Sequence, residues 1–179
     1  MPPSGWTRVQ TNPRDTWKID QVSVPYAGSY SADCEYDAQL AQQNEVLLSP
    51  EFQAASAQLQ FYSFGSLYWC RDTYDNCDLN VWLVVGDWGG GDDILVHTAD
   101  NDWTDTWAWS LSSVDLAPYL PPGTPVRVAF QYEGLDGAQV GLDAVSVTQG
   151  GALGAGIAAP GPNGWPDSQS RMWESGSGR

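Results

Sequence analysis

Acidic side chains are the residues of this sequence best suited to chemistry, and Asp143 is the most informative of them. Val145 and Val147 alternate with Ala144 and Ser146 in the last strand-like stretch, and at period two Asp143 falls on the valine face. If these valines point into a core, Asp143 points there too, unless a bulge resets the register. A carboxylate in that position needs a cation or several hydrogen-bond donors, because an uncompensated buried charge is too costly.

Calcium would satisfy such a carboxylate, because it takes about six to eight oxygen ligands from carboxylates, carbonyls and water. We therefore expect Asp143 to pair with an acid from the early strands around a structural Ca²⁺; the alternative is hydrogen bonding of Asp143 to loop amides. The early acids that could join it are Asp33, Glu35 and Asp37.

Two loops offer further acidic clusters. The loop at 100–105 lacks the glycine and the distal glutamate of an EF-hand, so its pattern is weakly specific. Its candidate ligands are Asp100, Asp102 and Asp105. Asp92-Asp93 lies beside three glycines, where a plain acidic hairpin is the alternative.

Tryptophans form the second chemically distinctive set. Binding of a glycan requires an exposed flat ring against the apolar face of a sugar, with polar groups nearby to fix its orientation. Trp82 alternates with the apolar side chains of its stretch, so it should project outward or toward a second layer. The others lie in or near loops at one expected end of the domain, where core or rim packing is the alternative for each. The candidate ligand-binding residues are Trp82, Trp88, Trp103 and Trp107.

The three cysteines predict one disulfide. Cys70 and Cys77 flank a polar, turn-forming loop, and a disulfide closing it would suit a secreted protein. Two unpaired thiols are the alternative. Cys34 lies in a strand-like stretch and is interpreted as a core residue.

Catalytic patterns are weak in this sequence. His97 is the only histidine and has no serine or cysteine motif around it, so we expect a structural role for it. A glycosidase with two carboxylates needs a defined separation between them, which the sequence does not provide. We therefore expect a protein that is not an enzyme.

The elements that must position these side chains are short stretches of alternating polarity. Two lie within residues 5–24, and the others cover 30–36, 45–48, 57–67, 78–86, 94–98, 107–114, 126–132 and 139–147. These roughly nine or ten short strands, with no long stretch at period 3.6, predict an all-β fold. We expect a two-sheet antiparallel β-sandwich of jelly-roll type.

The expected domain covers residues 1–149, and a Gly/Pro-rich tail follows at 150–179. The first part of the tail has the composition of a linker. Trp165, Met172 and Trp173 are then isolated apolar residues, so the tail is either disordered or docks on this domain or on a neighbouring copy.

Charge and hydropathy exclude some partners. The 22 acidic and 7 basic residues give a net charge of −15, which repels nucleic acid and anionic membranes. No apolar run approaches the roughly 20 residues that span a bilayer, so membrane insertion is not expected. The first four residues have no basic or apolar segment, so we expect no export signal within this sequence.

The order of motifs resembles a known group of domains. The first half contains Gly5-Trp6, Gly28-Ser29-Tyr30, Leu47-Leu48-Ser49-Pro50 and Leu59-Gln60-Phe61. The second half contains Trp107, the 114–119 segment, the 126–132 strand and Gly141-Leu142-Asp143-Ala144-Val145. Together, over about residues 5–148, they resemble the MAM-like jelly-roll superfamily, and most closely bacterial choice-of-anchor J and cleaved-adhesin domains.

This resemblance implies an extracellular, non-catalytic module, often with a structural Ca²⁺ near its final strand. Asp143 matches the first aspartate of the closing Leu-Asp-Asp-Val pattern, whereas Ala144 replaces the second. The acidic Phe-Glu segment that often precedes the opening Gly-Trp is absent here.

The leading hypothesis from the sequence is an extracellular recognition or adhesion module that binds glycan or protein and holds structural calcium. One alternative is a structural protomer of a filament or surface layer, which would self-associate through the C-terminal tail. Another is an accessory domain of a secreted peptidase.

Overall fold

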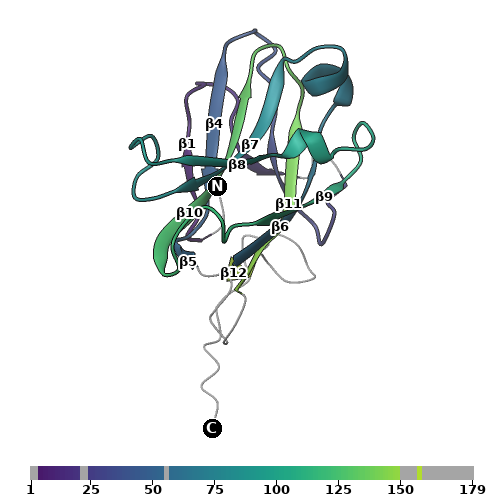
Figure 1. The fold of residues 1–179 in the computed structure, drawn as a ribbon. Coiled ribbons are helices and arrows are strands. Elements are labelled where there is room, and N and C mark those ends of the chain that lie inside the picture. Colours follow the sequence, from purple (N-terminus) through teal and green to yellow (C-terminus); the bar gives the residue numbers. More distant parts are fainter. Residues whose placement is uncertain (1–3, 21–23, 55–56, 150–156, 159–179) are drawn as a thin grey trace.

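The computed structural model describes residues 4–20, 24–54, 57–149 and 157–158, which build two antiparallel sheets (Figure 1). The first sheet has the order β1-β4-β10-β7-β8, and β5 also pairs with β10. Its strands are β1 (Thr7–Val9), β4 (Gln43–Leu48), β5 (Phe52–Ala54), β7 (Cys77–Val84), β8 (Ile94–Thr98) and β10 (Thr124–Gly134).

The second sheet has the order β2-β3-β11-β6-β9, and β12 also pairs with β11. Its strands are β2 (Lys18–Asp20), β3 (Ser31–Cys34), β6 (Ala57–Phe64), β9 (Ser110–Asp115), β11 (Val140–Gln149) and β12 (Ile157–Ala158). The predicted all-β sandwich is therefore confirmed.

Alternation of side chains builds the core between the two sheets. Phe130 of β10 and Phe61 of β6 are both fully buried, and their rings meet edge to face with centroids 5.1 Å apart. Burial of one such side chain contributes about 2 kcal/mol. The free thiol of Cys34 is buried in the same core, as predicted.

Two short helical turns connect the sheets at one end of the sandwich. They are η1 (Tyr68–Asp72) and η2 (Ala99–Asp102). Arg71 ties them together, because its Nη1 donates to the carbonyl oxygens of Asp100 and Trp103 at 3.0 Å each. Figure 1 shows η1 at the end of the sandwich remote from β12. Among the described residues, no helix has the length and apolar character needed to cross a membrane.

The register of β11 places Asp143 on the opposite face from the one predicted. Asp143 pairs with Tyr62, and the β11–β6 register shifts between Asp143 and Ser146, where Ala144 has φ +48°. This bulge lets Leu142 and Val145 both enter the core, so Asp143 faces away from it. The prediction that Asp143 shares the face of Val145 is thus wrong, although its carboxylate is fully buried.

Glu45 is the carboxylate that does occupy the core-facing side of a strand. It pairs with the core residue Tyr132 and is fully buried. Its Oε1 accepts hydrogen bonds from Thr11 N, Thr11 Oγ1 and Asn12 N, at 3.0, 2.6 and 2.6 Å. Three donors from the N-terminal segment therefore compensate the charge at Oε1, whereas Oε2 is buried without a hydrogen-bond partner among the described residues.

Some strand boundaries differ from the prediction for identifiable reasons. The strand expected at 57–67 ends at Phe64, because Gly65 lies against the Trp103 ring, where a Cβ atom would be 2.1 Å from a ring carbon. The strand expected at 107–114 begins only at Ser110, since Trp107 has φ +63°. The short strands β5 and β12 were not predicted.

The linker expected after residue 149 contains β12, where Ile157 pairs with Val147. This part of the tail therefore docks on the sandwich. Trp165, Met172 and Trp173 lie outside the described residues, so self-association through the tail stays a prediction.

Candidate ligand-binding site

A pocket of about 210 Å³ opens where four segments distant in the sequence meet. It is lined by Tyr36, which follows β3, by Trp69 of η1, by Trp107 between η2 and β9, and by the 136–139 turn. Three of its walls are thus aromatic, and the fourth is a polar turn between β10 and β11. Sequence reasoning identified only Trp107 among these residues.

Each tryptophan of the pocket is supported by another ring. Trp69 is stacked on Tyr74 with centroids 4.9 Å apart and an interplanar angle of 16°. Trp107 packs edge-on against Phe64 at 6.2 Å. Nevertheless, Trp107 is 52% exposed and Tyr36 is 40% exposed. The pocket therefore presents large rings whose conformations are restricted before any ligand arrives.

Trp107 adopts a backbone conformation that is rare for a bulky residue. Its φ of +63° lies in the left-handed region, which costs such a residue about 1–3 kcal/mol. The conformation is held by a hydrogen bond from Trp107 N to the carbonyl oxygen of Gly65, at 2.9 Å. Strain retained at an exposed aromatic residue points to a functional position.

The disulfide anchors the polar wall of the pocket. Cys70 is joined to Cys77, the pairing that the sequence predicts. The Ala138 amide donates to Cys77 Sγ at 3.2 Å, and Asn76 Nδ2 donates to the Asp136 carbonyl oxygen at 3.0 Å. Gly137 is required here, because a Cβ atom would lie 2.6 Å from Cys77 Cβ. The disulfide loop thus fixes both Trp69 and the 136–139 turn.

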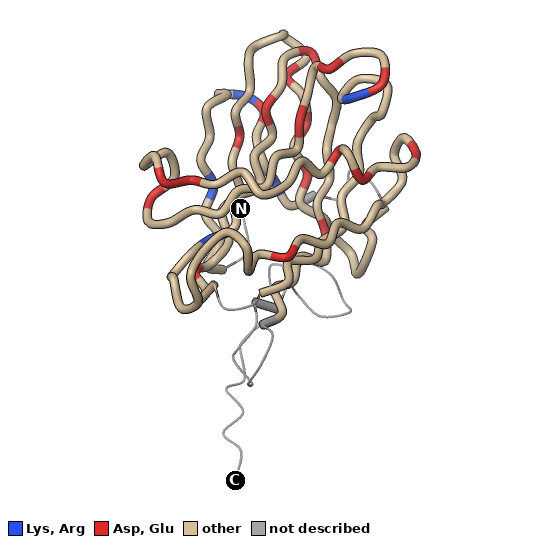
Figure 2. The backbone as a smooth tube through the Cα atoms, in the orientation of Figure 1, with Lys and Arg blue, Asp and Glu red and all other residues tan. Residues whose placement is uncertain are grey.

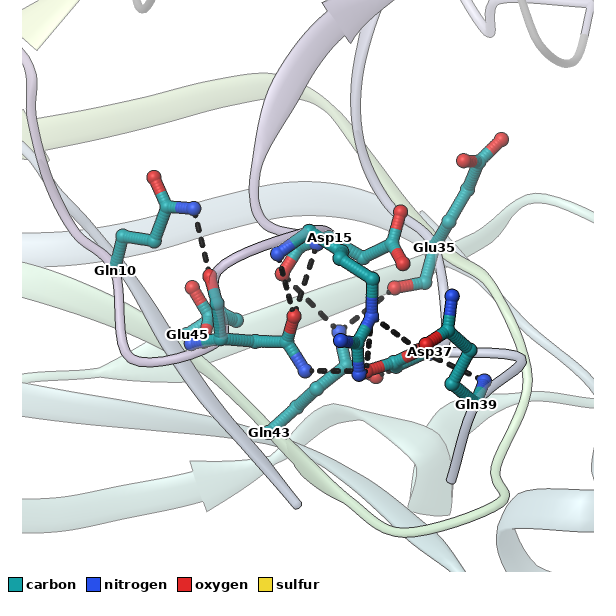
Figure 3. Close-up of polar contacts among 9 residues, drawn as sticks. Gln10, Asp15, Glu35, Asp37, Gln39, Gln43 and Glu45 are labelled. Carbon is teal, nitrogen blue, oxygen red and sulfur yellow. Dashed lines mark hydrogen bonds and ion pairs between the residues drawn. The ribbon is translucent and has the colours of Figure 1, made fainter. Parts of the chain in front are cut away.

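A polar network fixes the segment that carries Tyr36 (Figure 3). Asp37, the next residue, accepts hydrogen bonds from Asn12 Nδ2 at 2.8 Å and forms an ion pair with Arg14. Its amide donates to Gln43 Oε1 at 2.7 Å. These contacts clamp the chain after β3 against the N-terminal segment and β4, so Tyr36 projects from a rigid base.

The same network determines the charge state of Asp37. Hydrogen bonds from Arg14 and then Asn12 hold the pKa of the Asp37 carboxyl well below its usual range. The carboxylate is 98% buried by surface area but neutralised by Arg14, and Glu35 likewise forms an ion pair with Lys18 at 2.7 Å. Because each acid has a cation of its own, neither is a suitable calcium ligand.

The Tyr132 hydroxyl lies under the floor of the pocket. A Cβ atom at Gly137 would be 2.8 Å from this oxygen, which is buried and forms no hydrogen bond within the described structure. Burial, and next the proximity of Cys34, raise the pKa of Tyr132 far above its ordinary value. An unsatisfied buried hydroxyl destabilises the fold.

Asp33 and Asp143 are brought together on the outer face of the second sheet. Asp33 pairs with Gly141, two residues from Asp143 on β11, and both carboxylates are fully buried. Ser31 Oγ and Gln139 Nε2 donate to Asp33 at 2.9 and 3.3 Å. The Ala27 and Ala144 amides donate to Asp143 at 2.9 and 2.6 Å.

The donor chemistry of this pair fits a hard cation. Diagonal neighbours on paired strands have β-carbons about 7–8 Å apart, a separation that two carboxylates can bridge around one ion. Carboxylate oxygens are among the ligands that calcium prefers. Hydrogen bonding of Asp143 to loop amides is the alternative expected from the sequence, and the structure shows such bonds from the Ala27 and Ala144 amides.

The acidic loop at 100–105 does not form a site. Asp100 Oδ1 accepts from Leu79 N at 3.1 Å, while Asp102 Oδ2 lies 2.7 Å from His97 Nε2. Asp105 accepts from the Thr106 amide at 2.8 Å. The three carboxylates therefore diverge, and the described residues contain no group of three acidic, histidine or cysteine side chains placed to hold a metal.

Burial also alters the titration of Asp100. Loss of solvation raises the pKa of this carboxyl to about 6, although the Leu79 amide opposes the shift. The residue is 3% exposed.

The four candidate ligand-binding tryptophans occupy three different environments. Trp103 is 2% exposed and donates from Nε1 to Ser63 Oγ at 3.0 Å, so the prediction that it contacts a ligand is wrong. Trp82 and Trp88 meet edge to face at 5.9 Å on the outer face of the first sheet. Of these four candidates, only Trp107 lines the pocket. The binding roles of Trp82, Trp88 and Trp107 stay predictions.

Trp82 belongs to a row of polar contacts across the first sheet. Its Nε1 donates to Gln131 Oε1 at 2.7 Å, and Gln131 Nε2 donates to Asn44 Oδ1 at 2.9 Å. Since both partners are already engaged and Trp82 is half-buried, this row stabilises the sheet.

A second hollow, of about 460 Å³, lies near the 86–93 hairpin and has no aromatic wall. Asp93, one of its lining residues, accepts from the Gly89 amide at 2.7 Å. Asp92-Asp93 therefore matches the acidic-hairpin alternative.

The sequence matches no model of a known protein family, and no curated protein sequence matches it. Several solved structures share its fold. The K2 cleaved adhesin domain of Lys-gingipain superposes with a TM-score of 0.62 at 16% identity, covering 83% of this chain and 90% of that one. The K1 cleaved adhesin domain of Lys-gingipain from Porphyromonas gingivalis W83 gives 0.58 at 15% identity, covering 83% and 93%.

A carbohydrate-binding module is also similar. TmCBM61, solved in complex with β-1,4-galactotriose, gives a TM-score of 0.56 at 15% identity and covers 83% of this chain and 91% of that one. These likenesses show that the chain shares the β-sandwich fold of these domains. The finer resemblance to MAM-like and choice-of-anchor J domains stays a prediction.

Proposed function

We propose that this chain is a non-catalytic binding module of an extracellular protein, and that it binds glycan in the pocket beside the disulfide. One observation carries the proposal: Tyr36, Trp69 and Trp107 line a single hollow together with the polar residues Asp136 and Gln139. Sugar rings need an aromatic surface for their apolar face and polar groups for their hydroxyls, and this pocket offers both.

Three further features support this function. The disulfide suits an oxidising, extracellular environment. Similar folds occur in adhesin domains and in a carbohydrate-binding module crystallised with its oligosaccharide. Among the described residues, Asp136 is the one acidic residue that lines the pocket, whereas hydrolysis of a glycosidic bond ordinarily uses two carboxylates.

A glycan array tests the proposal directly. Wild-type protein, Trp107→Ala and the control Trp88→Ala are applied to an array of neutral, amino and acidic saccharides. We expect wild type and Trp88→Ala to bind the same glycans and Trp107→Ala to lose at least tenfold in signal, because the ring supplies the stacking surface. Binding by Trp107→Ala at wild-type strength, or no binding by wild type, would contradict the proposal.

We further propose that Asp33 and Asp143 hold one structural Ca²⁺. Their buried carboxylates are supported on adjacent strands, and Gln139 links Asp33 to the pocket wall. The Ala27 amide of the 24–30 loop donates to Asp143, so an ion that holds Asp143 would also fix this loop against β11.

Thermal unfolding tests this second proposal. Addition of CaCl2 to chelator-treated protein should raise the melting temperature of wild type and of the control Asp92→Ala, but not of Asp33→Ala, because only the last loses an oxygen ligand of the proposed site. An identical melting temperature of wild type in chelator and in millimolar Ca²⁺ would refute calcium binding.

A further inference from the structure

The size, shape and charge of the pocket bear on which part of a glycan it would accept. We infer that it recognises the terminal ring of a glycan chain, and that this ring is uncharged or cationic and not a uronic or sialic acid. This inference rests on the proposed function and deepens it.

The volume of the pocket limits its occupant. About 210 Å³ corresponds to roughly seven water molecules at about 30 Å³ each. Sites for drug-sized ligands are larger, at about 300–1,000 Å³. A single pyranose ring is the glycan unit that matches this smaller space.

The arrangement of the walls favours a chain end. Internal stretches of a polysaccharide need a groove in which successive rings meet successive aromatic platforms. Here Tyr36, Trp69 and Trp107 all line one hollow, and the 136–139 turn lines its remaining side. Trp82 and Trp88 lie on the outer face of the first sheet, away from the pocket, so they cannot extend the same site.

The electrostatics oppose an acidic sugar. Within the part of the chain that the structure describes, Asp136 is the one charged residue that lines the pocket. More acids crowd next to its turn: Glu133 pairs with Asp78, whose pKa is raised by burial and then by Asp75 and Glu133. Figure 2 shows that acidic residues recur along the loops while basic ones are sparse. A sugar carboxylate would meet the like charge of Asp136, and the net charge of −15 would add to this repulsion.

Asp136 allows a conservative test of this charge effect. Its φ of +55° is a conformation that asparagine adopts readily, so Asp136→Asn removes the charge without backbone strain. The amide retains hydrogen-bonding capacity for sugar hydroxyls.

The experiment measures affinity for matched pairs of sugars by ¹⁵N NMR titration of the indole N–H signals. Methyl galactoside is compared with methyl galacturonide, and methyl glucoside with methyl glucuronide, so each pair differs only in one carboxylate. Oligosaccharides of one to six rings with the same terminal sugar are then compared at equal concentration of chain ends.

We expect at least fivefold weaker binding of each uronide, and Asp136→Asn should narrow this difference to twofold or less. We expect affinity to change less than threefold from one ring to six. A uronide that binds wild type as tightly as its hexoside would overturn the charge inference. Affinity that rises more than tenfold with chain length, while still requiring Trp107, would overturn terminal recognition and leave the proposed function standing. If no glycan binding depends on Trp107, both the inference of terminal recognition and the proposed function are wrong.

Discussion

Replacement of Trp107 by glycine and by alanine separates the function of its ring from the cost of its backbone. Both variants lose the ring, so both should lose about tenfold or more in glycan affinity, as expected when a central aromatic contact is truncated. Their stabilities should differ, because φ at this position is +63°. A left-handed conformation costs an L-residue about 1–2 kcal/mol, and glycine avoids this cost.

The expected difference follows from two opposing effects. Relief of about 1–2 kcal/mol is offset by the greater freedom of glycine in the unfolded chain, about 0.4–1 kcal/mol. Trp107→Gly should therefore be more stable than Trp107→Ala by about 0.5–1 kcal/mol, which for a chain of this size raises the melting temperature by about 2 °C.

The measurement is chemical and thermal unfolding of both variants, with Trp88 as the matched control. Trp88 has no positive φ, so Trp88→Gly should be less stable than Trp88→Ala, the opposite sign. If Trp107→Gly proves less stable than Trp107→Ala, the reasoning about strain is refuted. If both Trp107 variants bind glycan as wild type does, the reasoning about the ring is refuted.

Three more predictions concern the structure around the site. Tyr132→Phe should raise the free energy of unfolding by about 1 kcal/mol, because it removes an unsatisfied buried hydroxyl; a loss of more than 1 kcal/mol in urea unfolding would contradict this. Burial raises the pKa of Asp100 to about 6, so the folded protein binds this proton more tightly than the unfolded chain does. Wild type should therefore lose about 2–3 kcal/mol of stability relative to Asp100→Asn as the pH rises from about 4 to 6. Parallel pH–stability curves of the two proteins would refute this assignment. Reduction of the Cys70–Cys77 disulfide, which spans seven positions, should lower stability by about 2 kcal/mol and weaken glycan binding, because Ala138 and Asn76 lose their anchor; unchanged affinity of a Cys70→Ser, Cys77→Ser protein would show that the disulfide does not brace the pocket.

The sandwich could be predicted because alternation is a local property. Val126, Val128 and Phe130 alternate with polar or small residues, and their stretch becomes β10 with these side chains in the core. The disulfide was predictable for the same kind of reason, since a short polar loop between two cysteines needs no tertiary information.

The position of Asp143 shows where alternation fails. One extra residue in β11 moves the carboxylate to the other face, and nothing in the local sequence indicates whether a bulge occurs. The core-facing acid is instead Glu45, whose donors come from Thr11 and Asn12, more than 30 positions away along the chain. Compensation of a buried charge by so distant a segment is visible only in the fold.

The pocket could not be predicted from the sequence, because its residues are distant along the chain and meet only in the fold. Tyr36, Trp69 and Gln139 come from separate loops, and each alone resembles ordinary rim packing. Trp69 immediately precedes Cys70, so the predicted disulfide begins beside it, but this position does not mark it as a site residue. Trp103 and Trp107 are four positions apart, and the sequence does not distinguish their environments. In the fold, however, Trp103 fills the space beside Gly65 whereas Trp107 lines the pocket.

The central claim is that glycan binds at Trp69 and Trp107 and not on the outer face of the first sheet. The most direct test is an NMR titration of ¹⁵N-labelled protein with a glycan that the array selects, in which assigned indole N–H signals report on each tryptophan. The signals of Trp69 and Trp107 should shift with ligand, while those of Trp82 and Trp88 should stay fixed. Shifts at Trp82 and Trp88, with Trp69 and Trp107 unchanged, would contradict this claim.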